Sequence, residues 1–188
     1  MTNVPRRAFP GLRIGPWTTT ALALAAIILL AVSTHDRKIV LVVEGWRQEY
    51  DKDGDVYYRC ASQICAVGSG VSFKGHHHQP ALTLEDFEDD FLDLAEAQKG
   101  RGHFRDVRIS EAKESTIEGV RVLQISREVD WDDGTKTFFI HARLVGPGKS
   151  SFLNSHSPER EWVGHNFDNF LGRLIDCWHS SRLDPRCN

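Results

Sequence analysis

The first apolar feature of the chain is a run from Ala21 to Val32, close to the N-terminus. Three arginines precede this run, and small residues follow it. This order is typical of a secretory signal. The wider stretch 17–34 contains 18 residues, which is just long enough to remain in a bilayer as an anchor. We therefore expect residues 1–34 to be a signal peptide or a single membrane anchor, and residues 35–188 to be one exported domain. A buried core helix is the remaining alternative for the apolar run.

Alternating apolar and polar residues predict strands in the part of the domain before residue 75. The stretches 39–50 and Val56–Cys60 flank a turn that contains Asp-Gly, so we expect them to form a hairpin. Ile64–Lys74 is predicted to be the next strand. Its apolar face would consist of Cys65, Val67, Val71 and Phe73.

Two helices are predicted from apolar stripes of helical period. The first, Thr83–Lys99, begins with a capping box formed by Thr83 and Asp86. Its stripe consists of Leu84, Phe87, Phe91, Leu94 and Ala95. In the second helix Ser157 would be the N-cap and Pro158 the first helical residue. The apolar face of this helix runs to Trp178.

Between the helices the pattern predicts an antiparallel meander of four strands, Val107–Ser115, Gly119–Val129, Thr135–Val145 and Ser150–His156. The third strand has an apolar face and a face with Thr137, His141 and Arg143, on which Phe139 is an exception. Short turns make neighbouring strands antiparallel. We therefore expect an α+β fold, in which an antiparallel sheet is covered on one face by the two amphipathic helices.

The charge of the exported part limits its partners. Removing the three N-terminal arginines from the 23 basic residues leaves 20 against 26 acidic residues, a net charge of −6. Nucleic-acid binding requires a basic surface, so nucleic acid is excluded as the main partner.

All four cysteines follow the apolar run, as expected for a protein that forms disulfides in an oxidising compartment. Four cysteines allow three connectivities. Because each pair is close in sequence, we expect the local bridges Cys60–Cys65 and Cys177–Cys187. A zinc site is the rival interpretation, but these spacings differ from the usual zinc-binding clips.

Two clusters of side chains are candidate binding sites. His76, His77 and His78 lie in a predicted loop, and imidazole is a common ligand of zinc, copper and nickel. Three adjacent histidines cannot all reach one ion, so a metal site would need a distant ligand; an exposed polar loop is the alternative. The other cluster is the acidic face of the first helix, which is either solvated or docks on a basic partner. It consists of Glu85, Asp86, Glu88, Asp89, Asp90 and Asp93.

Three motifs between residues 83 and 178 resemble the PsbP/Mog1/DcrB-like group. They are Leu84-Glu85-Asp86-Phe87, Gly119-Val120-Arg121-Val122, and the stretch from Ser157-Pro158-Glu159 to Phe170-Leu171. The resemblance covers about half of the chain and implies a small α/β/α sandwich. It also implies an exported binding or assembly factor, without a catalytic motif. The segment before Thr83 has no counterpart that we can place in this group, and the apolar run is not followed by a lipobox cysteine.

These features predict a non-catalytic binding or assembly-accessory module of a bacterial envelope. It would be periplasmic, or anchored in the inner membrane with its body in the periplasm. Its partner would be an envelope protein or a small ligand, and no cofactor is expected. The alternatives are a metal-binding protein that uses His76–His78 and a hydrolase of unknown class. Gly68-Ser69-Gly70 does not fit a nucleophile elbow, because the pattern continues as a strand and not as a helix.

Overall fold

The computed structural model describes residues 41–50, 55–99 and 103–179, which belong to one compact unit of the chain. The predicted signal or anchor, residues 1–34, lies outside these ranges. No helix in the described ranges is long and apolar enough to cross a bilayer.

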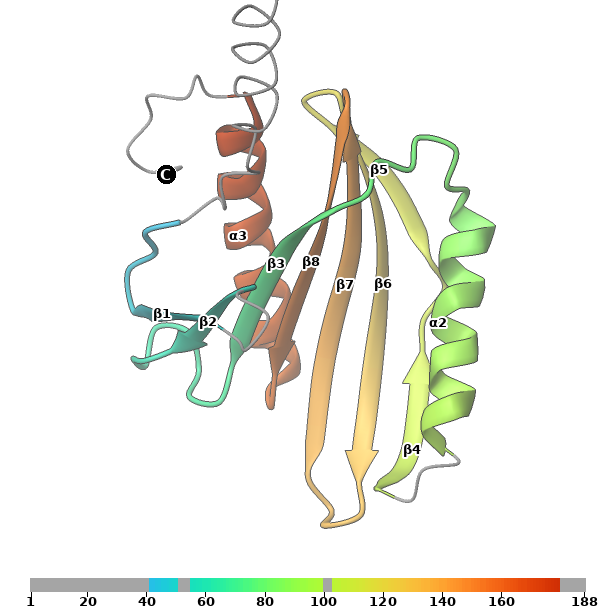
Figure 1. The fold of residues 1–188 in the computed structure, drawn as a ribbon. Coiled ribbons are helices and arrows are strands. Elements are labelled where there is room, and N and C mark those ends of the chain that lie inside the picture. The colour runs from blue at the N-terminus through green and yellow to red at the C-terminus, as the bar shows by residue number, and fades with distance from the viewer. Residues whose placement is uncertain (1–40, 51–54, 100–102, 180–188) are drawn as a thin grey trace, which may run out of the picture. The chain divides into compact units, whose positions relative to one another are not determined.

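The described residues form two helices and eight strands (Figure 1). The eight strands lie in one antiparallel sheet. In chain order the elements are β1 (Trp46–Tyr50), β2 (Val56–Cys60), β3 (Gly70–His76), α2 (Leu84–Lys99), β4 (Phe104–Ile109), β5 (Lys113–Ile117), β6 (Val120–Trp131), β7 (Lys136–Gly146), β8 (Lys149–Ser157) and α3 (Arg160–His179). The spatial order is β1-β2-β3-β8-β7-β6-β4, and β5 also pairs with β6. The predicted N-terminal hairpin and the meander are therefore confirmed, and the β3–β8 pair joins them into one sheet.

The two helices lie on opposite faces of the sheet, with α3 on one side and α2 on the other (Figure 1). Strand β6 shows why. Val120 and Val122 pack in the core under α3, whereas Leu123 and Ile125 pack under α2 with Phe87 and Phe91. Consecutive strand residues point to opposite faces, so a strand that is apolar on both faces needs a cover on each. The expectation that both helices cover one face is wrong, and the α/β/α arrangement implied by the resemblance is the observed one.

The predicted helix over residues 83–99 is confirmed, beginning at Leu84. The Thr83 hydroxyl lies 2.6 Å from an Asp86 carboxylate oxygen, and the Asp86 amide donates to that hydroxyl at 3.0 Å. The C-terminal helix is also confirmed, but it begins at Arg160, two residues later than expected. The amide of Val163 donates to the carbonyl oxygen of Glu159, just before the helix begins. The Ser157 hydroxyl accepts from the Glu159 amide, and not from an amide of the first helical turn.

Three predicted strands have different bounds in the structure. Within the predicted strand 39–50, only Trp46–Tyr50 is a strand among the described residues. The stretch from Ile64 is not extended, because β3 begins only at Gly70 and Val67 is 74% exposed in the preceding loop. Ala66 and Gly68 have φ angles of 56° and 91°, and these left-handed residues interrupt an extended path. The stretch Val107–Ser115 divides into β4 and β5, which pair with successive parts of β6.

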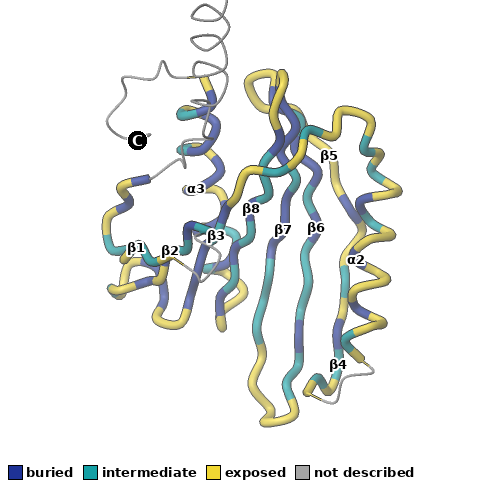
Figure 2. Tube along the Cα trace, in the orientation of Figure 1, coloured by how far each residue is buried: buried dark blue, intermediate teal, exposed yellow. Residues whose placement is uncertain are grey.

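Burial along the long strands is uneven. Figure 2 shows that β6 and β7 become less buried toward the turn that joins them. Helix α3 packs on β8, β7 and β3, and α2 packs mainly on β4 and β6. Each helix thus leaves a different part of the sheet without a helical cover among the described residues.

Candidate functional site

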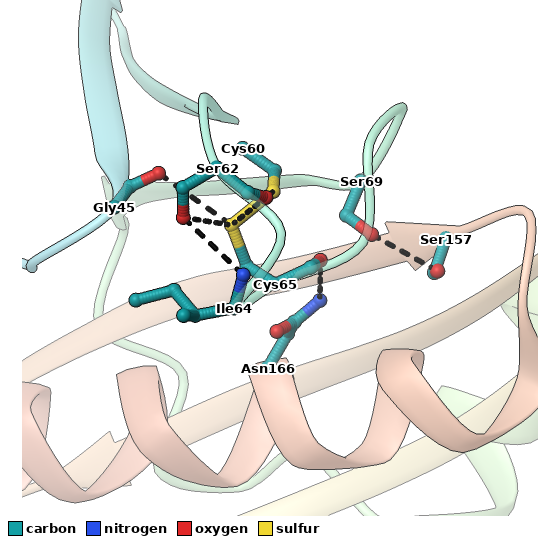
Figure 3. The surroundings of a disulfide bond; sticks show 8 residues. All are labelled: Gly45, Cys60, Ser62, Ile64, Cys65, Ser69, Ser157 and Asn166. Carbon is teal, nitrogen blue, oxygen red and sulfur yellow. Dashed lines mark hydrogen bonds between the residues drawn. A yellow bond between two sulfur atoms is a disulfide. The ribbon is translucent and has the colours of Figure 1, made fainter.

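The Cys60–Cys65 disulfide is present and closes the loop that follows β2 (Figure 3). Both cysteines are buried, with exposures of 6% and 1%. The loop is attached to the α3 region by two hydrogen bonds. Asn166 donates to the Cys65 carbonyl at 3.2 Å, and the Ser69 hydroxyl donates to that of Ser157 at 2.9 Å. The disulfide therefore holds a buried structural loop. The second expected bridge includes Cys187, which lies outside the described residues, and stays a prediction.

The three adjacent histidines lie where β3 ends. His76 is the last residue of β3, and its Nδ1 lies 3.3 Å from the carbonyl oxygen of His77. His78 Nδ1 lies 3.4 Å from the Ser150 hydroxyl. Within the described ranges, no three side chains of His, Cys, Asp or Glu are grouped so that they could hold a metal ion. Metal binding by His76, His77 and His78 stays a prediction.

The predicted acidic face lies on α2, and most of its carboxylates are exposed, with Glu88 partly buried. Asp86 is engaged in the capping box, and its hydrogen bonds from Thr83 lower its pKa. The remaining carboxylates, Glu85, Asp89, Asp90 and Asp93, are available to solvent. Their docking to a basic partner stays a prediction.

A cleft of about 350 Å³ lies where α3 stops covering the sheet. Its lining comes from the β4 and β6 strands, β7 and the first turns of α3: Arg108, Ile109, Ser110, Ser126, Arg127, Glu128, Phe138, Phe139, Ile140, Arg160, Val163 and Gly164. Gly164 keeps the helix side of the cleft open, because a Cβ atom added there would meet nothing within 4 Å. Phe138, Ile140 and Val163 provide apolar surface.

Glu128 is the centre of the charges at this cleft. Its carboxylate lies 2.9 Å from Lys136 Nζ and 3.0 Å from Arg108 Nη2, and it also accepts a hydrogen bond from Arg160. The hydrogen bond from Lys136 lowers the pKa of Glu128, and the positive charges of Arg108, Lys136 and Arg160 add to this effect. Glu128 is thus a carboxylate at neutral pH, and not a proton donor.

The chemistry of the lining favours recognition. The Ser110 hydroxyl is engaged with the β6 backbone, since it accepts from the Ser126 amide at 3.1 Å and donates to its carbonyl at 3.3 Å. The twelve lining residues include neither histidine nor cysteine. An apolar surface beside a rim of paired charges can hold an apolar group and orient its polar end.

The pattern analysis missed this cleft, although β6 carries a signal for it. On its α3 side, Val120 and Val122 are followed by Ser126, Glu128 and Asp130. A strand face that changes from apolar to charged marks the point where its cover ends. The sequence did not indicate that Arg108 and Arg160 would meet Glu128 there, because they come from segments far apart in the chain.

Comparisons with known proteins identify the fold. The structure is similar to the solution structure of cyanobacterial PsbP (CyanoP) from Synechocystis sp. PCC 6803. The TM-score is 0.52 at 17% sequence identity, and the match covers 70% of this chain and 81% of the other. No family model matches the sequence. No curated protein sequence matches it either. The expected resemblance is thus confirmed as one of fold, and this chain has a PsbP-like fold.

Proposed function

We propose that this chain is an extracytoplasmic, non-catalytic binding module of a bacterial envelope, and that the cleft beside α3 holds part of its ligand or partner. The cleft carries the proposal. It combines apolar surface from Phe138, Ile140 and Val163 with ion pairs around Glu128. Its volume of about 350 Å³ lies within the usual size range of ligand pockets.

Two observations support the location outside the cytoplasm. The buried Cys60–Cys65 bridge is of the kind that forms and persists in oxidising compartments. The basic flank and apolar run at residues 6–32 have the composition of an export signal. The PsbP-like fold agrees with this, since the resemblance implies exported binding or assembly factors.

The occupant that suits this cleft is an apolar side chain or a small amphipathic ligand. Arg160 lies 5.0 Å from the centre of the Phe138 ring, so its cation sits directly beside the apolar surface. An apolar group could rest on Phe138 and Ile140 while a polar end interacts with the exposed cations. This binding role requires no buried ionised side chain that takes part in catalysis.

Location is tested with the full chain fused at its C-terminus to alkaline phosphatase, which is active only outside the cytoplasm. We expect an active fusion, and a matching fusion to a fluorescent protein that folds only in the cytoplasm should be dark. An inactive phosphatase together with four thiols that react with a maleimide in intact protein would contradict the proposed location.

The cleft is tested by placing a photo-crosslinking phenylalanine analogue at position 164 in the full chain, expressed in cells. Position 172 is the matched control, since Gly172 is also a helical glycine of α3 with nothing within 4 Å of an added Cβ. We expect one defined crosslinked product at position 164, which is lost when Phe138 and Ile140 are both replaced by Ser. Identical products at positions 164 and 172 would contradict binding in the cleft.

A further inference from the structure

The face of the sheet that carries α2 is covered by that helix only in part. Helix α2 packs mainly on β4 and β6, and Phe91 reaches further to His141 and Phe152. In the described residues, the strip formed by β7, β8 and β3 has no helix above it on this face. Three strands span roughly 14 Å at the usual strand spacing. This strip, which we call the β7–β3 strip, lies on the face opposite the one that α3 covers, although Phe139 on it and Arg127 beside it also line the cleft.

A continuous series of aromatic rings crosses the β7–β3 strip and begins at Tyr57 on β2. The rings of Tyr57 and His156 stack with their centres 6.1 Å apart, and those of Phe139 and His141 stack at 5.7 Å. Between these pairs, His156 and Phe139 are tilted, with their centres 5.8 Å apart. Gly70 makes the first contact possible, because a Cβ there would lie 2.1 Å from the Tyr57 hydroxyl and 2.4 Å from His156 Cε1. Tyr57 of β2 and helix α2 thus lie on the two sides of this aromatic surface.

Positive charge without a carboxylate partner lies in the β7–β3 strip, at Arg143, and beside it on β6, at Arg127. The Arg127 guanidinium lies 4.5 Å from the centre of the Phe139 ring, and that of Arg143 lies 5.4 Å from Phe152. Neither arginine forms an ion pair with another described residue. Arg127 donates only to an amide oxygen, that of Gln98, at 2.8 Å. The negative charge of Asp90 acts on Arg143 from beyond ion-pair distance.

Several buried polar atoms of the β7–β3 strip and of the neighbouring Arg127 have no hydrogen-bond partner among the described residues. They are both ring nitrogens of His141, Nε and Nη1 of Arg143, Nε of Arg127 and Oδ1 of Asn154. His141 is 6% exposed and is the cross-strand neighbour of Asn154. Native proteins satisfy nearly all such buried groups, and buried charges are normally paired. Most of these atoms are donors, and two of the side chains are cations, so the group that completes them is an anion with oxygen acceptors.

We propose that the β7–β3 strip binds the oxyanion group, a carboxylate or a phosphate, of a small organic ligand. Arg143 is the principal donor, because its buried Nε and Nη1 have no hydrogen-bond partner among the described residues, and Arg127 supports it from the other side of His141. The planar guanidinium fork matches both oxyanions. The aromatic series from Tyr57 to Phe152 provides the surface for the organic part of the ligand.

The test uses the full chain and three probes of similar size: benzoate, phenyl phosphate and the cation benzylamine. Binding is followed by calorimetry and by the ¹⁵N NMR signals of the arginine Nε–H groups. We expect saturable binding of at least one anion and none of benzylamine, with the signals of Arg143 and Arg127 shifting first. Failure of both anions to saturate, or equal binding of benzylamine, would overturn the proposal.

Variants separate this site from general charge attraction. Arg143→Gln should lower the affinity for the anion by about 10-fold or more, as expected for a lost hydrogen bond to a charged group. Lys136→Gln removes an exposed cation that is paired with Glu128 on the opposite face of the sheet, and should change affinity by less than about 2-fold. If Arg143→Gln does not fold, Arg143→Lys keeps the charge but loses the fork, and weaker binding is again expected. Unchanged affinity in the folded variant would overturn the proposal.

Gly164→Trp, which fills the cleft beside α3, should leave anion binding unchanged, so this site and the proposed function can fail independently.

Discussion

Asn166 in α3 donates a hydrogen bond to the carbonyl oxygen of Cys65, with 3.2 Å between the two atoms (Figure 3). The residues are 101 positions apart, and Asn166 is 2% exposed. A polar side chain inside the apolar face of a helix is costly unless it is bonded. This contact therefore explains why α3 carries an asparagine among its buried residues: it attaches the disulfide loop to the helix.

Replacing Asn166 with Ala should lower the free energy of unfolding by about 1–3 kcal/mol, because the buried Cys65 carbonyl would lose its partner. Urea denaturation measures this. Asn169→Ala is the matched control, since Asn169 is exposed and accepts only from Arg173 within the same helix. Equal losses in the two variants would contradict a structural role for the Asn166–Cys65 bond.

The double substitution Cys60→Ser and Cys65→Ser should lower stability by about 2 kcal/mol, the value expected for the loop entropy of a short bridge. The loop that the bridge closes is buried at Cys65, so a loosened loop should also expose the end of β2. Urea unfolding gives the free energy, and amide hydrogen exchange at Tyr58 and Cys60 reports the local effect. Unchanged exchange and an unchanged unfolding midpoint would contradict this account.

Gly70→Ala should destabilise the protein by about 1–3 kcal/mol, as is typical of overpacking. The new Cβ would collide with Tyr57 and His156, whose rings meet above this residue. Gly75→Ala is a close control in the same strand, because its Cβ would meet nothing within 4 Å. If thermal or urea unfolding shows the same loss for both, the close packing over Gly70 is not what requires a glycine.

Stability should depend on pH through His141. Burial lowers the pKa of His141 from 6.5 to about 3, and the charges of Arg127 and His156 act in the same direction. The unfolded chain therefore binds a proton between these values while the folded chain does not. The stabilising effect is complete above about pH 6.5, and it is lost at up to about 1.4 kcal/mol per pH unit as the pH falls toward 3.

Urea unfolding of His141→Phe at pH 7, 6 and 5 measures this dependence. The variant places a ring among Phe91, Phe139 and Phe152 and should reduce the slope between pH 6 and 5. Burial also lowers the pKa of His156, so part of the slope should remain. The exposed His165→Gln is the control and should keep the slope of the natural protein. A slope in His141→Phe that is as steep as in the natural protein would assign the pH dependence to other groups.

Local patterns predicted most elements because they depend on neighbouring residues. The capping box at Thr83 and Asp86 determined where α2 begins, and the turn at residues 132–134 determined where β6 passes into β7. The same reasoning failed at Ile64, where apolar residues suggested a strand. There the disulfide and two left-handed residues, Ala66 and Gly68, form a loop instead.

Phe139 shows where prediction stops for the candidate sites. In the sequence it is an exception on a polar strand face, and in the structure it stacks on His141 and makes a tilted ring contact with His156. The strand pattern states which face a residue occupies, but not which strands lie beside it. Because β3 pairs with β8, Ser72 lies across from Asn154, and Tyr57, which lies across from Ser72, reaches His156.

By itself, the sequence determined the order of helices and strands, the antiparallel direction of hairpin neighbours and the Cys60–Cys65 pair, because each depends on short-range periodicity or spacing. Only the tertiary structure decided that α2 and α3 cover opposite faces, and that each leaves part of the sheet without a helix. The physical reason is that a helix is about 10 Å wide and cannot cover a sheet of this many strands. The uncovered parts, with Glu128 on one face and Arg143 on the other, are therefore properties of the packing and not of any local segment.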